Sequence, residues 1–170
     1  MENAKIHIYF GDGKGKTTAA IGLAVRALGA GKKVTFCQFL KDGTSSELNV
    51  LSKFKACETM YYSQPMKFIQ LMSEDEKKMC KLIETDLFMK ACKTKADIII
   101  LDEVLDLIDW EILDEQLLLY FLDNHKGSEV VLTGRMPTKE IAKKADYATE
   151  MKMLLHPFNE GEPARKGIEY

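Results

Sequence analysis

The chain has 170 residues, of which 46% are hydrophobic and 29% are charged, and its formal net charge is -2 at pH 7. This composition excludes collagen-like, disordered and disulfide-scaffold proteins. The near-zero net charge provides no broad basic field that would hold a nucleic acid, so no nucleic-acid partner is expected. The length suits one domain, which we expect to span residues 1–170.

The start of the chain and its cysteines indicate the compartment. A glycine-rich loop is reached by Gly11, which leaves no room for a signal peptide, and no later segment has an apolar run long enough to cross a bilayer. The four cysteines include no C-x-x-C pair, so a structural zinc site is not expected. We therefore expect a cytoplasmic protein with reduced thiols and no membrane partner.

The first three elements are predicted to be a strand, a helix and a strand. Residues 5–10 form a short apolar run that stops at a glycine, which predicts a buried strand entering a tight loop. Residues 16–28 are rich in alanine and leucine and lead into a glycine pair, as expected for a helix and its end. Residues 33–40 are almost continuously apolar, which is typical of a strand covered on both faces.

Two helix starts are predicted from the capping-box spacing. Thr44 precedes Glu47 and Ser73 precedes Glu76 by three residues, so each hydroxyl and carboxylate can satisfy backbone donors at a helix start. Between these two helices, residues 58–62 are predicted to form a strand.

The second half of the chain continues the alternation. Residues 97–103 give the strongest strand prediction, because four apolar residues end in two carboxylates, and we expect this strand to be central. A helix is predicted over residues 109–122, a strand over residues 128–133 and a helix from Pro137. This order predicts an α/β fold with a mostly parallel sheet flanked by helices, followed by an irregular tail from about residue 156.

Residues 11–18 read GDGKGKTT between a predicted strand and a predicted helix, which is the context of a phosphate-binding P-loop. Glycines let backbone N–H groups converge on phosphate oxygens, and the helix directs its positive dipole end at the same charge. Lys16 would add a point charge, and Thr17 would place its hydroxyl on Mg²⁺. The fold prediction is therefore the P-loop NTPase (RecA-like) type, and the alternative is a glycine-rich turn that only reverses the chain.

The loop is one residue shorter than the usual G-x-x-x-x-G-K-[ST] pattern. Counting back from Gly15 places Phe10 where the first glycine belongs, and the glycine follows one residue later at Gly11. A shorter loop cannot cup phosphates in the common way, so we expect the nucleotide to sit differently from its pose in ordinary kinases and GTPases.

Three charged residues follow predicted strands and should lie at the same sheet edge. Asp102 and Glu103 end an apolar strand, where a carboxylate can hold Mg²⁺ directly or through water. The alternative is an acidic strand end that caps a helix. Arg135 follows the next predicted strand, and its planar guanidinium suits phosphate oxygens, although an exposed arginine in a turn is the equal alternative.

These segments together carry a family resemblance that spans nearly the entire chain. They are GDGKGKTT at residues 11–18, QFLK at residues 38–41, LDE at residues 101–103, TGR at residues 133–135 and GIEY at residues 167–170. In this combination the chain resembles the ATP:corrinoid adenosyltransferase family of cobalamin biosynthesis and salvage. The short loop and the C-terminal motif are the most specific parts of the resemblance.

The resemblance implies transfer of the adenosyl group from Mg·ATP to the Co(I) of a corrinoid, with release of triphosphate. It also implies a homodimer, a reductase of the flavoprotein type as electron donor, and ATP bound with its phosphates reversed relative to most P-loop enzymes. Co(I) is itself the nucleophile, so no protein base is needed. The protein must supply orientation, exclusion of water and positive charge for the departing triphosphate.

By position, the resemblance assigns three sets of residues. ATP contacts fall on Gly11, Asp12, Gly13, Lys14, Gly15, Lys16, Thr17, Thr18, Arg26 and Arg135, catalytic roles on Lys14, Lys16 and Arg135, and metal roles on Thr17, Asp102 and Glu103. Asp12 stands where the family often has asparagine, and its added negative charge would weaken ATP binding or move toward the metal.

The corrinoid side departs from the family. The family places aromatic side chains against the corrin to remove the axial ligands of Co(II), but the segment before Phe68 contains no tryptophan where the family has a Phe-Thr-Trp type of sequence. Tyr61, Tyr62 and Phe68 are therefore the candidate corrinoid contacts, with ordinary packing as the alternative for each. The lone Trp110 is predicted to have a packing role.

Two other functions use the same residues. A P-loop kinase or ATPase acting at the γ-phosphate would use the loop and the acidic pair, but no acceptor site is evident. A non-catalytic module that binds ATP or a corrinoid would need no turnover at all.

Overall fold

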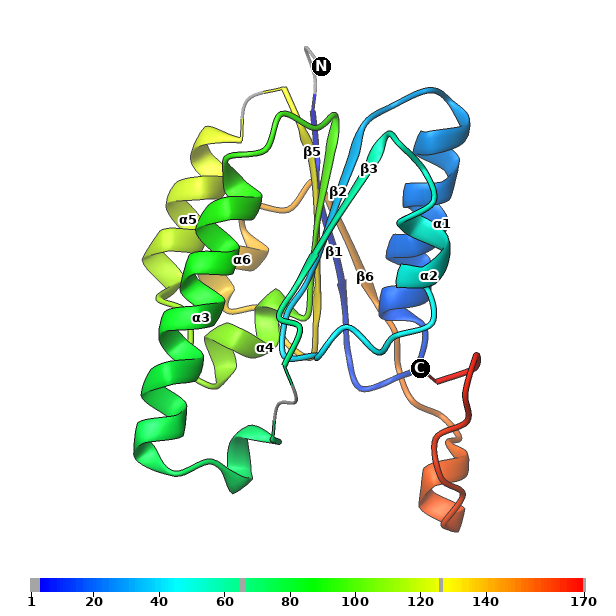
Figure 1. The fold of residues 1–170 in the computed structure, drawn as a ribbon, viewed down its shortest axis with the longest axis vertical. Coiled ribbons are helices and arrows are strands. Elements are labelled where there is room, and N and C mark those ends of the chain that lie inside the picture. The colour runs from blue at the N-terminus through cyan, green and yellow to red at the C-terminus, as the bar shows by residue number, and fades with distance from the viewer. Residues whose placement is uncertain (1–3, 65–66, 126, 170) are drawn as a thin grey trace.

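A six-stranded parallel sheet with helices on both faces forms the body of the protein (Figure 1). The computed structural model describes residues 4–64, 67–125 and 127–169. The strands are β1 (Ile6–Phe10), β2 (Val34–Gln38), β3 (Cys57–Tyr61), β4 (Ile98–Asp102), β5 (Glu129–Gly134) and β6 (Tyr147–Glu150), in the order β3-β2-β4-β5-β1-β6. The predicted α/β fold with a parallel sheet is confirmed, and β4 lies inside the sheet as expected.

The helices cover the two faces unequally. They are α1 (Lys16–Gly29), α2 (Leu48–Leu51), α3 (Glu74–Cys92), α4 (Val104–Asp109), α5 (Glu115–Asn124) and α6 (Lys139–Ala142), with 3-10 turns at Ile69–Leu71 and Pro157–Glu160. Figure 1 shows α1 and α2 on one face and α3, α4, α5 and α6 on the other. None of the helices in the described ranges is long and apolar enough to span a membrane.

The core has one cluster on each face of the sheet. On the α1 side, Ala20, Ala24 and Ala27 lie on one face of the helix and pack against Phe36 and Ile100. On the other side, buried side chains of α3, α4 and α5 pack against the opposite face of the same strands. Because both faces are covered, β2 and β4 are buried along their whole length, as their nearly continuous apolar sequence predicted.

One of the two predicted capping boxes forms. The Ser73 hydroxyl accepts from the N–H of Glu76 at 3.3 Å, and the Glu76 carboxylate accepts from the N–H of Ser73 at 2.8 Å. The box at Thr44 and Glu47 is wrong, because α2 begins only after Glu47 and has no side-chain cap. The Thr44 hydroxyl instead donates to Asp42 at 2.6 Å, which closes a local turn.

The helix predicted over residues 109–122 forms only from Glu115 on, as α5, because the chain breaks between α4 and α5. Glu111 has a left-handed φ of 56°, which ends α4. The Asp114 carboxylate then accepts from the N–H of Gln116 at 2.9 Å and caps a new helix. The apolar periodicity continued through the break, so the cap was the missed signal.

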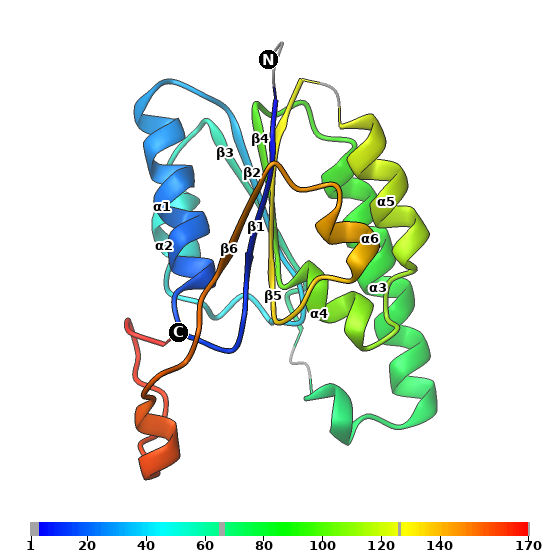
Figure 2. The ribbon, with the colours of Figure 1, turned by 180° about the vertical axis from the view of Figure 1, so that it is seen from behind.

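The chain also holds a strand that the sequence did not predict. β6 pairs with β1 at the edge of the sheet, and all four of its residues are exposed. An exposed edge strand lacks the apolar pattern by which strands are recognised. Figure 2 shows β6 leading into the C-terminal segment, which lies beside the start of α1.

Candidate active site

The loop between β1 and α1 lies at the carboxyl edge of the sheet, near the ends of β4 and β5. The N–H of Gly11 donates to the carbonyl of Arg135 at 2.8 Å, which ties the loop to the residue after β5. The Lys16 ammonium folds back over the loop and donates to the carbonyl of Gly13 at 2.8 Å. The predicted phosphate loop therefore lies at the edge where open α/β folds bind ligands.

Close contact with Met151 explains two of the loop glycines. A Cβ on Gly11 would lie 2.3 Å from the carbonyl oxygen of Met151, and one on Gly13 would lie 2.6 Å from it. The N–H of Gly13 also donates to this oxygen at 2.7 Å. The amides of Gly11 and Gly13 are thus bonded within the protein, so phosphate-binding amides would have to come from the rest of the loop and the first turn of α1.

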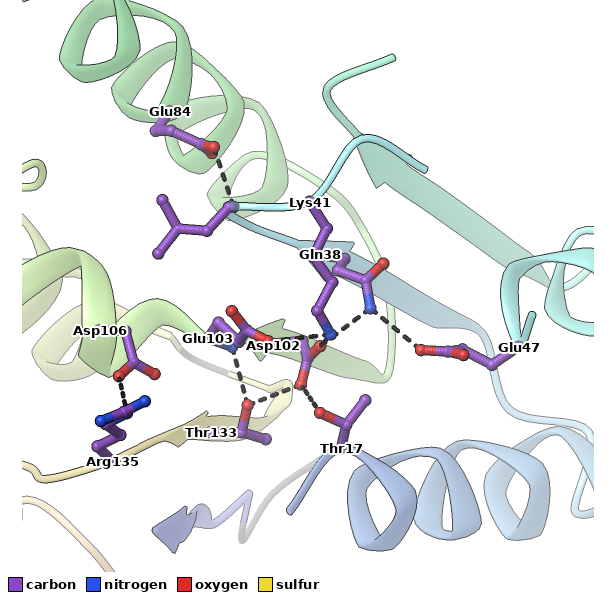
Figure 3. A network of polar contacts seen from close by, with 11 residues as sticks. Thr17, Gln38, Lys41, Glu47, Glu84, Asp102, Glu103, Asp106, Thr133 and Arg135 are labelled. Carbon is purple, nitrogen blue, oxygen red and sulfur yellow. Dashed lines mark hydrogen bonds and ion pairs between the residues drawn. The ribbon is translucent and has the colours of Figure 1, made fainter. Parts of the chain in front are cut away.

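Asp102 is a fully buried carboxylate on which four donors converge (Figure 3). Its Oδ1 accepts from the hydroxyl of Thr17 at 2.8 Å and from that of Thr133 at 2.7 Å. Its Oδ2 accepts from Gln38 Nε2 at 3.1 Å and lies 3.4 Å from Lys41 Nζ. These partners come from α1, from the ends of β2 and β5, and from the loop after β2, so one carboxylate joins the parts of the sheet edge.

Glu103 and Lys41 extend this network. The Lys41 ammonium lies 3.0 Å from Glu103 Oε1, so it bridges Asp102 and Glu103. Burial raises the pKa of Glu103 above its ordinary value, and the Lys41 charge opposes that shift. Burial alone would lower the pKa of Lys41, but the carboxylates of Asp102 and Glu103 outweigh it and raise the pKa. The ammonium therefore stays charged between the two acids.

Thr17, Asp102 and Glu103, the metal ligands predicted from the sequence, suit Mg²⁺ in kind. A hydroxyl and two carboxylates are hard oxygen donors, and Mg²⁺ is commonly held by one or two carboxylates together with substrate phosphates. Both oxygens of Asp102 already accept hydrogen bonds, and Lys41 lies between the two acids. Thr17 and Glu103 could bind the ion directly, with Asp102 acting through water or after Lys41 moves.

A cavity of about 350 Å³ opens beside this network. Its polar wall includes Lys16, Thr17, Glu103, Asp106 and Arg135. The Arg135 side chain is 82% exposed, and its Nε lies 3.9 Å from Asp106 Oδ1. The structure therefore brings Lys16 and Arg135, two of the predicted catalytic residues, to one cavity.

The charges in this wall shift the pKa of two groups. Burial lowers the pKa of the Lys16 ammonium, and the positive charge of Arg135 lowers it further, while Asp106 opposes the shift. Burial raises the pKa of Asp106, and Arg135 opposes that shift. Lys16 and Arg135 repel each other across the cavity, so an anion between them would relieve unfavourable charge.

Two aromatic residues line the same cavity. Phe68 is 77% exposed and Trp110 is 39% exposed, and both lie in the cavity wall with Lys16 and Arg135. Trp110, which was expected only to pack, is left partly exposed by the break after α4. The cavity thus joins a cationic wall to an aromatic one.

The two tyrosines lie elsewhere. The ring of Tyr61 packs against Gly43, where an added Cβ would lie 2.2 Å from it, so Tyr61 supports the loop after β2. Tyr62 lines a separate cavity of about 190 Å³ beside α3, together with Met72 and Met79. Of the three predicted corrinoid contacts, only Phe68 lines the cavity next to the phosphate loop. Part of the predicted aromatic segment, residues 65–66, lies outside the described residues.

The C-terminal segment contacts two other charged residues of the loop. The Asp12 carboxylate accepts from the N–H of Met153 at 2.9 Å, and this hydrogen bond lowers the pKa of Asp12. Asp12 therefore anchors the tail in this structure. The Lys14 ammonium lies 2.9 Å from Glu169, which also pairs with Arg165. This contact gives a physical role to the C-terminal motif, whose last residue, Tyr170, lies outside the described residues.

Two more predicted ATP contacts are on α1. Thr18 is exposed in the first turn of the helix, next to the loop. Arg26 is exposed in the last turn, ten residues after Lys16 and so about 15 Å along the helix axis. Within this chain, the structure does not bring Arg26 to the phosphate loop.

Three residues of the site were given no role from the sequence. Lys41 was part of the QFLK segment, but nothing in the sequence placed its ammonium between the two acids. Asp106 lies between apolar residues of α4, and a charge in that setting was the available signal. Trp110 had no signal, because its exposure depends on where α4 stops.

Comparison with known proteins finds relatives over nearly the whole chain. The family model described as ATP:corrinoid adenosyltransferase BtuR/CobO/CobP matches residues 2–170. A corrinoid adenosyltransferase of Escherichia coli K12 is 30% identical over 172 residues, covering 99% of this chain and 87% of the relative. The corrinoid adenosyltransferase CobA of Salmonella typhimurium is 30% identical over 176 residues, with the same coverage of 99% and 87%.

A solved structure supports the fold alone. The flagellar accessory protein FlaH from Methanocaldococcus jannaschii superposes with a TM-score of 0.54 at 19% identity, covering 85% of this chain and 69% of that one. The family match extends over nearly every residue, and the phosphate loop, the acidic pair and the C-terminal motif meet at one edge of the sheet. The chain therefore belongs to the ATP:corrinoid adenosyltransferase family, a family of transferases.

Proposed function

We propose that this protein transfers the 5′-deoxyadenosyl group of ATP to the Co(I) of a corrinoid and releases triphosphate. In this reaction the electron pair of Co(I) forms a bond to the 5′ carbon, the bond from that carbon to the triphosphate oxygen breaks, and the triphosphate leaves with the bonding electrons. The observation that carries the proposal is the single cavity that joins Lys16 and Arg135 to Phe68 and Trp110.

The cationic wall suits the departing group. Lys16 and Arg135 provide positive charge where negative charge develops on the triphosphate, and a fixed charge costs little reorganisation at that moment. Lys14 is held by Glu169 in this structure, so its proposed contact with the triphosphate requires an exchange of partners. Mg²⁺, held through Thr17, Glu103 and Asp102, would supply further charge to the phosphates.

The aromatic wall suits the corrin. Phe68 and Trp110 present large, partly exposed apolar surfaces in the wall of a cavity whose other wall is polar. An apolar surface against one face of the corrin would exclude water from the cobalt, which favours loss of its axial ligands. This arrangement orients the nucleophile toward the nucleotide without a protein base.

The cellular setting is part of the same proposal. We infer a single-domain cytoplasmic enzyme that works as a homodimer and receives electrons from a flavoprotein-type reductase. Family membership supports these features.

A second candidate function is hydrolysis at the γ-phosphate. One observation favours it: Glu103 lines the cavity and has a pKa raised by burial, as a general base for water would need. The ion pair of Glu103 with Lys41 speaks against this role, because Lys41 stabilises the charged carboxylate.

Product analysis on the cobalt side tests the proposal. The protein is incubated with Mg·ATP and a chemically reduced corrinoid, and the corrinoid is then analysed by mass spectrometry and by its light-sensitive absorbance. A new adenosyl group bonded to cobalt supports the proposal. ATP consumption with an unchanged corrinoid would favour hydrolysis, and no reaction at all would indicate a binding module.

A further inference from the structure

Glu84 is a buried carboxyl that contacts the loop after β2 (Figure 3). It lies on α3, and its exposed fraction is 0%. One carboxyl oxygen accepts from the N–H of Leu40 at 3.0 Å, and the other has no hydrogen-bond partner among the described residues. Burying a half-satisfied carboxyl is unfavourable, so its contact with Leu40 needs an explanation beyond stability.

Leu40 is itself in an uncommon conformation. Its φ is 56°, in the left-handed region that a branched side chain such as leucine rarely adopts. The residue before it, Phe39, still pairs with β4 through a hydrogen bond of 3.1 Å from its N–H to the carbonyl of Asp102. The chain therefore leaves the sheet at Leu40, at the residue whose N–H Glu84 accepts.

The left-handed turn determines where the next side chain points. In an extended chain, successive side chains alternate between the two faces of the sheet. Because the chain turns at Leu40, the ammonium of Lys41 instead reaches across the sheet edge to lie 3.4 Å from Asp102 and 3.0 Å from Glu103. Figure 3 shows Lys41 running from this turn to the two acids.

We propose that Glu84 is a positioning residue that holds Leu40 in its left-handed turn and thereby places Lys41 between Asp102 and Glu103. With the ammonium there, Lys41, Asp102 and Glu103 together carry one net negative charge, so they can accept a metal-bound nucleotide without repelling the triphosphate. Without it, two neighbouring carboxylates would face the phosphates. The consequence for Mg·ATP rests on the proposed function, whereas the placement of Lys41 does not.

Calorimetric titration of Mg·ATP into four variants tests the consequence. Glu84→Leu and Lys41→Met should each raise the Kd roughly tenfold, the effect of one charged hydrogen bond. Glu84→Gln should change the Kd less than about twofold, because the amide oxygen can still accept from Leu40. Phe88→Leu, one turn further along α3, is the control for loosened packing, because Phe88 is buried on the same helix and lines a different cavity.

The double variant Glu84→Leu with Lys41→Met separates positioning from independent effects. If Glu84 acts through Lys41, the double variant should bind no more weakly than Lys41→Met alone, whereas independent effects would multiply to roughly a hundredfold. A multiplied effect, an unchanged Kd in Glu84→Leu, or an equal rise in Phe88→Leu would overturn the proposal.

A crystal structure of Glu84→Leu tests the placement directly and needs no nucleotide. We expect the Lys41 ammonium to lie beyond about 4 Å from both carboxylates, outside ion-pair distance. If it keeps its contacts to Asp102 and Glu103, the proposal is wrong. Failure of the wild-type protein to bind Mg·ATP would instead contradict the proposed function and leave this structural outcome decisive for Glu84.

Discussion

The two walls of the cavity are built in opposite ways. Behind the cationic wall lies a buried network in which one carboxylate, Asp102, accepts hydrogen bonds from separate parts of the chain, including Thr17 of that wall. The aromatic wall consists of two partly exposed side chains, Phe68 before the 3-10 turn Ile69–Leu71 and Trp110 just after α4. The residues of the phosphate wall that bond to Asp102, such as Thr17, are thus fixed before ligand binds, whereas the aromatic wall depends on a ligand to cover it.

Under the proposed function, this difference assigns each wall to a different half of the reaction. A triphosphate needs charge and hydrogen-bond donors held in place, and burial of the network provides that. A corrin needs a large apolar surface, which exposed rings can provide without a fixed network. Substitutions in the two walls should therefore change different kinetic constants.

The largest effect is expected in the phosphate wall, at Lys16. Lys16→Ala should lower turnover roughly a hundred- to a thousandfold at saturating ATP, because it removes a preorganised charge beside the departing triphosphate. Lys14→Ala is the matched control, since Lys14 is paired with Glu169 at the tail and should lose roughly tenfold or less. Steady-state assays of both variants check this, and full activity in Lys16→Ala would contradict the assignment.

The free energy of unfolding should depend on pH through the buried carboxyl of Glu84. Burial raises the pKa of Glu84 from its ordinary 4.5 to about 7. Between these values the unfolded chain is ionised at this residue while the folded protein keeps the proton, so rising pH favours unfolding. The free energy of unfolding should fall by about 3 kcal/mol from pH 4.5 to pH 7 and then level off.

Urea unfolding of wild type and Glu84→Gln across this pH range isolates the effect. Glu103 also interacts with Glu84 and titrates in the same direction, so the difference between the two proteins is the quantity to follow. The free energy of unfolding of wild type minus that of Glu84→Gln should fall steadily with rising pH up to about 7. A constant difference would show that Glu84 is ionised throughout.

The aromatic wall should show a smaller and different effect. Phe68→Ala and Trp110→Ala should each raise the KM for the corrinoid roughly three- to tenfold, the contribution of one ring contact, and leave the KM for ATP unchanged. Leu71→Ala is the control, because Leu71 is 71% exposed on the same segment but does not line the cavity. Equal changes in both constants would show that the two walls do not act separately.

The smallest effect is expected at Asp12. Asp12→Asn should change ATP affinity less than about twofold, because this exposed carboxylate accepts its hydrogen bond from the tail. Asp12→Ala should make the chain after Met153 more sensitive to limited proteolysis, since it removes the acceptor for that N–H. A large gain in ATP affinity in either variant would place the carboxylate near the phosphates instead.

The same contrast explains what the sequence could predict. The phosphate loop and the acidic pair were predictable because residues 11–18 and the end of β4 carry their chemistry in consecutive residues. The positions of Lys41 and Trp110 were not, because they depend on a left-handed turn at Leu40 and on the end of α4. Which of the three candidate aromatic residues lines the cavity depends on tertiary structure, and Phe68 does so while the two tyrosines lie elsewhere.

The most direct test of the central claim is the phosphorus product. Phosphorus NMR of a reaction with Mg·ATP and reduced corrinoid should show one inorganic triphosphate for each adenosylated corrinoid, because the cationic wall receives three linked phosphate groups as one leaving group. Release of orthophosphate or diphosphate as the primary product, in step with turnover, would contradict the account.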